Sequence, residues 1–144
     1  MNNWTSKFFA GIFAGTLLAV SFNTNAHDSF AAHEADGVEK ILPANLMKAK
    51  LAGVDGIEVI VSRVAIPPNT TLPTHWHPGE EFAYVIDGEV TLWQKGKDDI
   101  VAKKGDTVKV PLKQIHTAKT GDKAAVVLVF RVHEEGQPER VKAE

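Results

Sequence analysis

One short stretch decides how this chain is interpreted, His75-Trp76-His77-Pro78-Gly79-Glu80-Glu81. Side chains alternate along an extended strand, so His75 and His77 point to the same face. The Pro78-Gly79 pair then bends the chain, and Glu80 or Glu81 returns a carboxylate to the space that the imidazoles face. Two imidazoles and a carboxylate that converge on one point are ligands for a divalent transition metal.

Short runs of β-branched or alternating residues flank this stretch and predict strands. They lie at 57–66, 82–86, 89–94, 100–102, 107–110 and 124–132, and turn residues separate them. The run at 124–132 is the most apolar, which predicts a central strand. Residues 38–51 are either two short strands interrupted by Pro43 or a partly helical segment. Six short strands without a convincing helix predict an antiparallel β-sandwich or β-barrel.

A third histidine completes the candidate site. His116 follows the turn after the strand predicted at 107–110, and a tight turn there swings its imidazole toward the centre of a barrel. With His75, His77 and one glutamate it provides three nitrogen ligands and one oxygen ligand. One or two coordination positions then stay open, as they do in catalytic metal sites.

These residues resemble the two sequence motifs of the cupin family. The first motif is His-x-His, three residues, Glu, six residues and Gly, and it is matched by His75, His77, Glu81 and Gly88. The second is Gly, five residues, Pro and then His, and it is matched by Gly105, Pro111 and His116. The matches span residues 69–116, and the flanking strands extend the resemblance over most of the chain after residue 26.

The resemblance implies a fold and a cofactor. The fold is all-β, a single antiparallel jelly-roll β-barrel at residues 38–134. The cofactor is one divalent transition metal (Fe, Mn, Zn, Ni or Cu), with the ligands His75, His77, Glu81 and His116. The resemblance also selects Glu81 over Glu80, and alternation from Glu81 then turns Ala83 and Val85 inward and Phe82, Tyr84 and Ile86 outward.

Three positions depart from the family pattern, and none of them removes a ligand. Asn69 stands where the first motif opens with Gly, and Asn tolerates the left-handed conformation that such a turn needs. Lys113 stands where the second motif usually has Gly, so we expect a different shape for the loop before His116. Thr120 replaces an Asn, so we expect a different contact around the ligands.

Residues 1–26 look like a signal peptide. Lys7 is the only charge before Asp28, residues 8–22 are apolar, and small residues precede a cut after Ala26. The apolar run is shorter than the roughly 20 residues of a spanning helix, although a retained anchor is the alternative. Cleavage near Ala26 predicts a periplasmic or secreted protein without stable membrane insertion. The mature protein would begin with a flexible segment at 27–37 and end in a charged tail at 135–144.

Length and composition set further limits. The chain has 144 residues, which favours one domain. Its formal charge is −2, and loss of Lys7 with the signal segment makes it −3, which is too mild for a nucleic-acid partner. The chain has no cysteine, so neither a thiolate ligand nor a thiol nucleophile is present.

The sequence also predicts positions for several residues outside the motifs. Aromatic residues at strand spacing are usually core or interface, and we expect one shared face for Trp76, Tyr84 and Trp93. Open jelly-roll sheets have edges through which family members often pair, so a homodimer is expected. We favour surface positions over cavity positions for Arg63, Gln94, Gln114 and Arg131. We also expect a surface position for His133.

Two functions fit this sequence. The first is an exported metalloenzyme that acts on a small molecule, either dioxygenase-like or isomerase-like. Glu80 is the only general base evident beyond the ligands, which favours dioxygenase-like chemistry. The alternative is a non-catalytic periplasmic protein that binds a metal or a small ligand. A metal that faces a sizeable pocket with polar groups favours the enzyme, whereas a closed site in a filled barrel favours binding.

Overall fold

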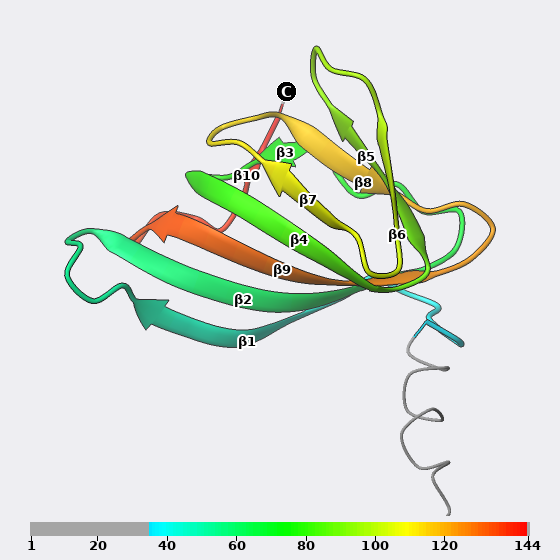
Figure 1. Cartoon of the computed structure of the whole chain (residues 1–144), viewed down its shortest axis with the longest axis horizontal. Helices are drawn as coiled ribbons and strands as arrows, with labels where there is room; N and C mark the ends of the chain where they lie inside the picture. Colours follow the sequence, from blue (N-terminus) through cyan, green and yellow to red (C-terminus); the bar gives the residue numbers. More distant parts are fainter. Residues whose placement is uncertain (1–34, 144) are drawn as a thin grey trace, which may run out of the picture.

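Two antiparallel β-sheets face each other in the computed structural model, which describes residues 35–143. The first sheet has the strand order β1-β2-β9-β4-β7, with the bounds Leu42–Lys50, Ile57–Ile66, Ala125–Glu134, Gly79–Asp87 and Thr107–Val110. The second has the order β10-β3-β8-β5-β6, with the bounds Val141–Lys142, His75–Trp76, His116–Lys119, Glu89–Gln94 and Ile100–Lys103. Residues 35–143 contain no helix, and the predicted all-β jelly roll is confirmed (Figure 1).

The long strands of the first sheet form one wall of the barrel. β9 lies between β2 and β4, so the prediction of a central strand there is confirmed. It pairs with β2 over ten residues, from Ile57 opposite Glu134 to Ile66 opposite Ala125. Residues 42–50 form the single edge strand β1, whose register shifts between Asn45 and Met47. An edge strand tolerates proline, because its outer N–H groups bond to no neighbour.

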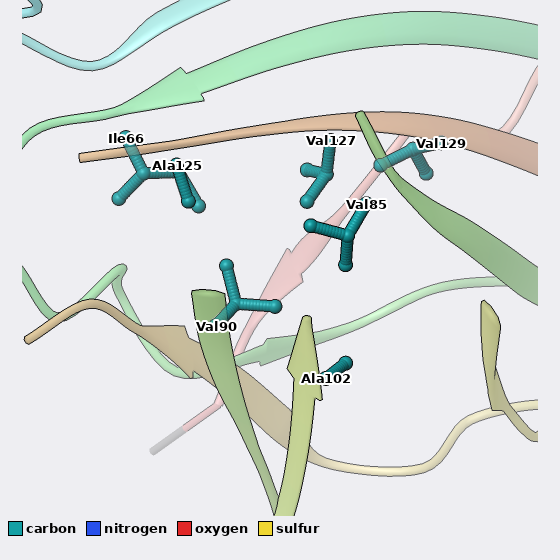
Figure 2. Close-up of a cluster of buried hydrophobic side chains, with 7 residues drawn as sticks. All are labelled: Ile66, Val85, Val90, Ala102, Ala125, Val127 and Val129. Atoms are coloured by element: carbon teal, nitrogen blue, oxygen red, sulfur yellow. The ribbon is translucent and has the colours of Figure 1, made fainter. Parts of the chain in front are cut away.

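The hydrophobic core fills one end of the space between the sheets. Its side chains come from both sheets and point toward one another in Figure 2: Ile66, Val85, Val90, Ala102, Ala125, Val127 and Val129. The predicted alternation along β4 holds for four residues. Val85 is buried and Ala83 packs against the core, whereas Phe82 and Tyr84 are 39% and 45% exposed.

The expected shared face of three aromatic residues is wrong. Tyr84 belongs to β4 in the first sheet, whereas Trp76 and Trp93 belong to β3 and β5 in the second. Alternation within single strands does not reveal which sheet a strand joins. Strand spacing alone therefore could not establish a common face.

Two non-glycine residues adopt the left-handed backbone conformation that the motif glycines usually supply. Asn69 has φ 50°, as the sequence predicts. Lys113 has φ 57°, so it takes the conformation that a glycine adopts freely. Its backbone N–H donates to the carbonyl of His77 at 3.2 Å, which ties the loop before His116 to the first motif.

Thr120, the third departure, links two loops. Its hydroxyl accepts the backbone N–H of Thr70 at 3.0 Å and donates to the carbonyl of Pro67 at 2.5 Å. The two backbones also bond directly, from the N–H of Thr120 to the carbonyl of Thr70 at 2.9 Å. Thr120 therefore fixes the turn that precedes the first motif.

The segment after β9 differs from the expected charged tail. Val141 and Lys142 form β10, which pairs with β3 so that Val141 lies opposite Trp76 and Lys142 opposite His75. The N–H of Ala143 donates to the carbonyl of Thr74 at 3.1 Å. A two-residue strand is too short to show a hydrophobic period, which is why the sequence pattern resembled a tail.

The expected surface position of His133 is also wrong, because its side chain is fully buried. Its Nδ1 lies 2.8 Å from the carbonyl of Glu134, and its Nε2 lies 3.1 Å from the carbonyl of Pro138. His133 thus links β9 to the C-terminal segment through its contact with Pro138.

The predicted signal peptide at 1–26 lies outside the described residues, as does most of the segment at 27–37. Within residues 35–143, no helix has the length and apolar character needed to cross a membrane.

Gly79→Ala is expected to destabilise the fold by more than about 2 kcal/mol, through overpacking. Gly79 lies opposite His133 where β4 meets β9, and a Cβ there would come within 2.2 Å of the carbonyl oxygen of Val132. The measurement is the free energy of unfolding in urea. Gly121→Ala is the matched control, since no atom lies within 4 Å of its added Cβ, and it should stay within about 1 kcal/mol of wild type. Equal unfolding midpoints for the two variants would contradict the prediction.

Candidate metal centre

The structure brings together the three histidines that the sequence singled out. His75 and His116 lie opposite each other on β3 and β8, and His77 follows directly after β3. Their ring centroids are 4.5 to 5.2 Å apart. One ligand atom from each ring lies within 4.8 Å of the other two, and all three side chains are buried. This spacing allows all three rings to reach a single metal ion.

Backbone carbonyls orient all three imidazoles. The Nδ1 of His75 lies 2.6 Å from the carbonyl of Pro73, and that of His116 lies 2.9 Å from the carbonyl of Gln114. The Nδ1 of His77 bonds in the same way to the carbonyl of Glu139. A carbonyl only accepts, so each ring donates its Nδ1–H and keeps a lone pair on Nε2. This is the tautomer in which histidine binds a metal through Nε2.

The charge state of His75 agrees with this role. Burial lowers the pKa of the His75 imidazole to about 4, although its hydrogen bond to the Pro73 carbonyl acts in the opposite direction. His75 is therefore neutral near pH 7, and its Nε2 lone pair is available without displacement of a proton.

Glu81 brings a carboxylate to the same point from β4. Its Oε2 lies 2.9 Å from the Nε2 of His77, and its Oε1 lies 3.7 Å from the Nε2 of His116. Burial alone would raise the pKa of Glu81, but the neighbouring imidazoles of His116 and His77 and the charge of Arg131 hold this pKa well below its usual range. Glu80 instead pairs with Lys109 at 2.7 Å, with 42% of its side chain exposed. Of the two glutamates, Glu81 is therefore the one whose carboxylate lies beside the imidazoles.

The four side chains fit a divalent cation. The Nε2 of His77 is buried and has no hydrogen-bond partner among the described residues. Its closest polar neighbour is a carboxylate oxygen, and two lone pairs 2.9 Å apart repel each other unless a proton or a cation lies between them. Three imidazole nitrogens and one carboxylate suit Fe, Mn, Zn, Ni or Cu.

Arg131 contacts the same Glu81 oxygen, Oε2, that lies beside His77, and the expectation of a surface position is wrong for this residue. Its side chain is 10% exposed, and its Nε donates to Glu81 Oε2 at 3.0 Å. Arginine binds a carboxylate in a fixed geometry, which orients Glu81 toward the imidazoles. The surface expectation is also wrong for Gln94, which is 2% exposed, whereas Arg63 and Gln114 are partly exposed. None of these three residues lines the cavity described below.

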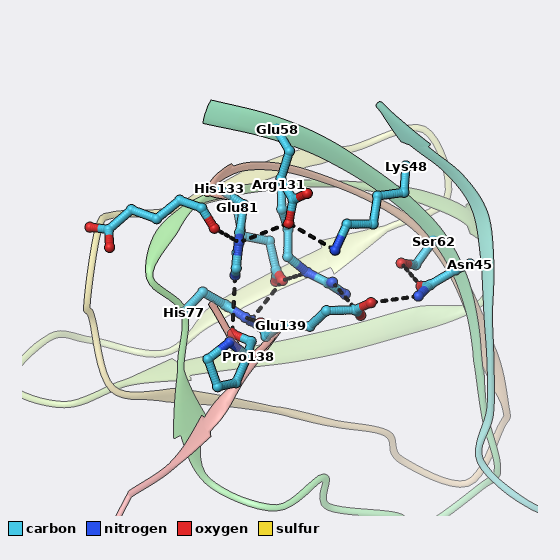
Figure 3. Close-up of polar contacts among 11 residues, drawn as sticks. Asn45, Lys48, Glu58, Ser62, His77, Glu81, Arg131, His133, Pro138 and Glu139 are labelled. Atoms are coloured by element: carbon cyan, nitrogen blue, oxygen red, sulfur yellow. Dashed lines mark hydrogen bonds and ion pairs between the residues drawn. The ribbon is translucent and has the colours of Figure 1, made fainter. Parts of the chain in front are cut away.

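Glu139 contacts the candidate centre and was not singled out in the sequence. Its Oε2 accepts from Arg131 Nη1 at 3.3 Å, and its Oε1 accepts from Asn45 Nδ2 at 2.6 Å (Figure 3). Asn45 Oδ1 in turn accepts from the hydroxyl of Ser62 at 2.6 Å. Glu139 therefore holds two candidate ligands, His77 through its backbone carbonyl and Glu81 through Arg131. No sequence signal identified Glu139, because its contacts join residues that are far apart along the chain.

The centre opens into a cavity of about 700 Å³ between the two sheets. This volume lies within the usual range of small-molecule sites. Most of the lining is apolar and includes Leu72, Val90, Leu92, Val108 and Val110. The polar lining gathers around the candidate ligands and the C-terminal segment: Asn45, Ser62, Thr74, Arg131, Glu139, Arg140 and Lys142.

Comparison with known proteins supports one family. Residues 62–131 match a family model described as a cupin domain, and this range includes all four candidate ligands. The match and the shared fold support membership of the cupin superfamily. No curated protein matches the chain in sequence.

Solved structures share the fold at low identity. The DMSP lyase DddQ from Ruegeria pomeroyi superposes with a TM-score of 0.62 at 23% identity over 76% of this chain, which spans about half (54%) of the lyase. A cupin-like protein from Thermotoga maritima gives 0.59 at 21% identity, covering 72% of this chain and 75% of the other. An RmlC-like cupin with a double-stranded β-helix fold from Methanocaldococcus jannaschii gives 0.51 at 18%, covering 63% and 82%. These similarities establish the fold, not the activity.

Glu139→Ala is expected to weaken metal binding about 10- to 100-fold, as loss of residues that support ligands does elsewhere. The substitution removes the carboxylate that holds Arg131 and Asn45. The measurement is the Zn²⁺ dissociation constant in competition with a chelator. Glu135→Ala is the matched control, because Glu135 pairs with Lys50 at 2.7 Å away from the centre. An unchanged constant for Glu139→Ala in a folded protein would show that Glu139 does not support the ligands.

Proposed function

We propose that this protein is an exported, mononuclear metalloenzyme that acts on a small molecule in the barrel cavity. The observation that carries the proposal is the convergence of three Nε2 lone pairs and a buried carboxylate at a cavity of about 700 Å³. The ligands would be His75, His77, Glu81 and His116. A structural metal site is closed by its ligands, whereas a catalytic site faces space for a substrate.

The metal would supply Lewis-acid or redox chemistry at its open positions. The protein's own residues would orient the ligands and shape the cavity. Carbonyls of Pro73, Gln114 and Glu139 hold the imidazoles, and Arg131 holds Glu81. The apolar lining excludes water from the reacting molecule and strengthens electrostatic interactions around it.

Dioxygenase-like chemistry is the reaction class that we favour. Apart from the candidate ligands, the ionisable residues that line the cavity are Arg131, Glu139, Arg140 and Lys142. Glu139 is paired with Arg131, so no free carboxylate serves as a general base. Isomerase-like or lyase-like chemistry at the same centre is the alternative reaction, and the shared fold of a DMSP lyase is compatible with it.

A non-catalytic periplasmic protein that binds a metal or a small ligand remains the second candidate function. The specific observation in its favour is the apolar cavity, which would hold a ligand without transforming it. Turnover of any bound molecule by the metal-loaded protein separates the two functions.

Metal analysis tests the site directly. Untagged wild-type protein isolated from its native compartment should carry about one transition metal per chain, and His116→Ala should lose most of it, because one of four ligands is gone. The measurement is elemental analysis with protein quantification. His33→Ala controls for loss of a histidine outside the proposed centre. A metal-free wild type, or a His116→Ala variant that keeps its metal, would refute the proposal.

Export has its own test. The full-length chain produced in a bacterial host should be recovered from the periplasm or medium with His27 as its first residue, because small residues precede Ala26. Intact-mass measurement gives the new N-terminus. Full-length protein in the membrane fraction would indicate a retained anchor instead.

A further inference from the structure

We propose that Arg140 and Lys142 form an anion-binding subsite at the cavity rim, and that the natural ligand is a small molecule with one anionic group and an apolar body. This inference rests on the proposed function, since it names the ligand class of the same cavity. It goes further because neither residue belongs to the metal centre or to the cupin motifs.

The pairing of β10 places both cations on the cavity side. Lys142 lies directly opposite His75 in the antiparallel register, and opposite residues share a face of the sheet. His75 faces the cavity, so Lys142 does too. Side chains alternate along a strand, so Arg140 and Lys142, two residues apart, point to the same face. Val141, which lies opposite Trp76, points to the other face. Arg140 and Lys142 both line the cavity and are both exposed, which places them at its rim.

Neither cation is neutralised. Within residues 35–143, the side chains of Arg140 and Lys142 make no ion pair or hydrogen bond. The two carboxylates of the cavity pair with other residues. Glu81 pairs with Arg131, and the two oxygens of Glu139 bind Arg131 and Asn45.

The charge balance of the lining favours an anion. Its three cations, Arg131, Arg140 and Lys142, face two carboxylates, Glu81 and Glu139, which leaves one positive charge before any metal is counted. A divalent ion would make the cavity more positive. Charges of one sign around a low-dielectric space concentrate ligands of the opposite sign.

The chemistry of the two residues defines the anionic group. A guanidinium binds a carboxylate or a phosphate through two parallel hydrogen bonds, and an ammonium adds a compact charge. The apolar wall, with Leu72, Leu92 and Val108, offers no partners for a polyhydroxylated body such as a sugar. The best-fitting ligand therefore has its anion at the rim and its hydrocarbon inside.

Four probes with one hydrocarbon chain test this proposal on the mature protein: octanoate, octyl phosphate, octanol and octylamine. Calorimetry or NMR titration gives each dissociation constant. The better of the two anions should bind at least about tenfold more tightly than octanol, as expected for charge-assisted hydrogen bonds, and octylammonium should bind most weakly. The tighter anion distinguishes a carboxylate ligand from a phosphate ligand.

Two double variants complete the test. Arg140→Gln with Lys142→Gln should remove the preference for the anion over octanol. Lys104→Gln with Lys123→Gln makes the same change in net charge at exposed positions outside the cavity lining and should keep it. Thermal unfolding confirms that both variants are folded.

The outcomes separate this proposal from the metal centre. The subsite is refuted if neither anion binds, if octanol binds as tightly as the anions, or if the folded Arg140/Lys142 double variant keeps the preference. A wild type without stoichiometric metal that still prefers the anion would refute the proposed metalloenzyme and support the subsite. The reverse result, a metal-loaded protein without the preference, would refute only the subsite.

Discussion

The contact between the buried carboxylate of Glu81 and the Nε2 of His77, 2.9 Å apart, constrains the rest of the structure. Both atoms carry lone pairs once the Nδ1–H of His77 is committed to the Glu139 carbonyl, so the contact needs a cation or a proton to be stable. A buried carboxylate also needs compensation, and Arg131 provides it by a hydrogen bond to the same Oε2 atom at 3.0 Å. The arrangement is thus suited to a positive ion between the imidazoles and the carboxylate.

This constraint explains how the space between the sheets is divided. One end is filled by small and branched apolar side chains such as Val85 and Ala125, which provide the hydrophobic stabilisation of the barrel. Toward the histidines the lining becomes mixed and a cavity remains. The two regions share a wall, because four core residues also line the cavity: Ile66, Val90, Val127 and Val129.

The C-terminal segment completes the site. His133 bonds to the carbonyl of Pro138, Glu139 supports His77 and Arg131, and β10 pairs with the strand that carries His75. These contacts link the end of the chain to the first motif. A segment that resembles a charged tail in sequence thus contacts the candidate ligands and lines part of the cavity.

The sequence by itself predicted six of the strands and the candidate ligand set, but it did not predict β8 or β10 as strands. The six predicted strands are β2, β4, β5, β6, β7 and β9. Period-2 patterns and turn residues report local preferences, and the spacing from His75 to His116 is readable because the motif residues are chemically distinctive. Asn69 was predictable for the same local reason. Only the tertiary structure decided the positions of Arg131, His133, Glu139 and Lys142. Glu139 contacts Asn45 and His77 from far along the chain, and β10 has only two residues, so no local period reports these contacts. Long-range pairing sets which charges are buried together, and that pairing follows from the packing of two sheets, not from any short stretch of sequence.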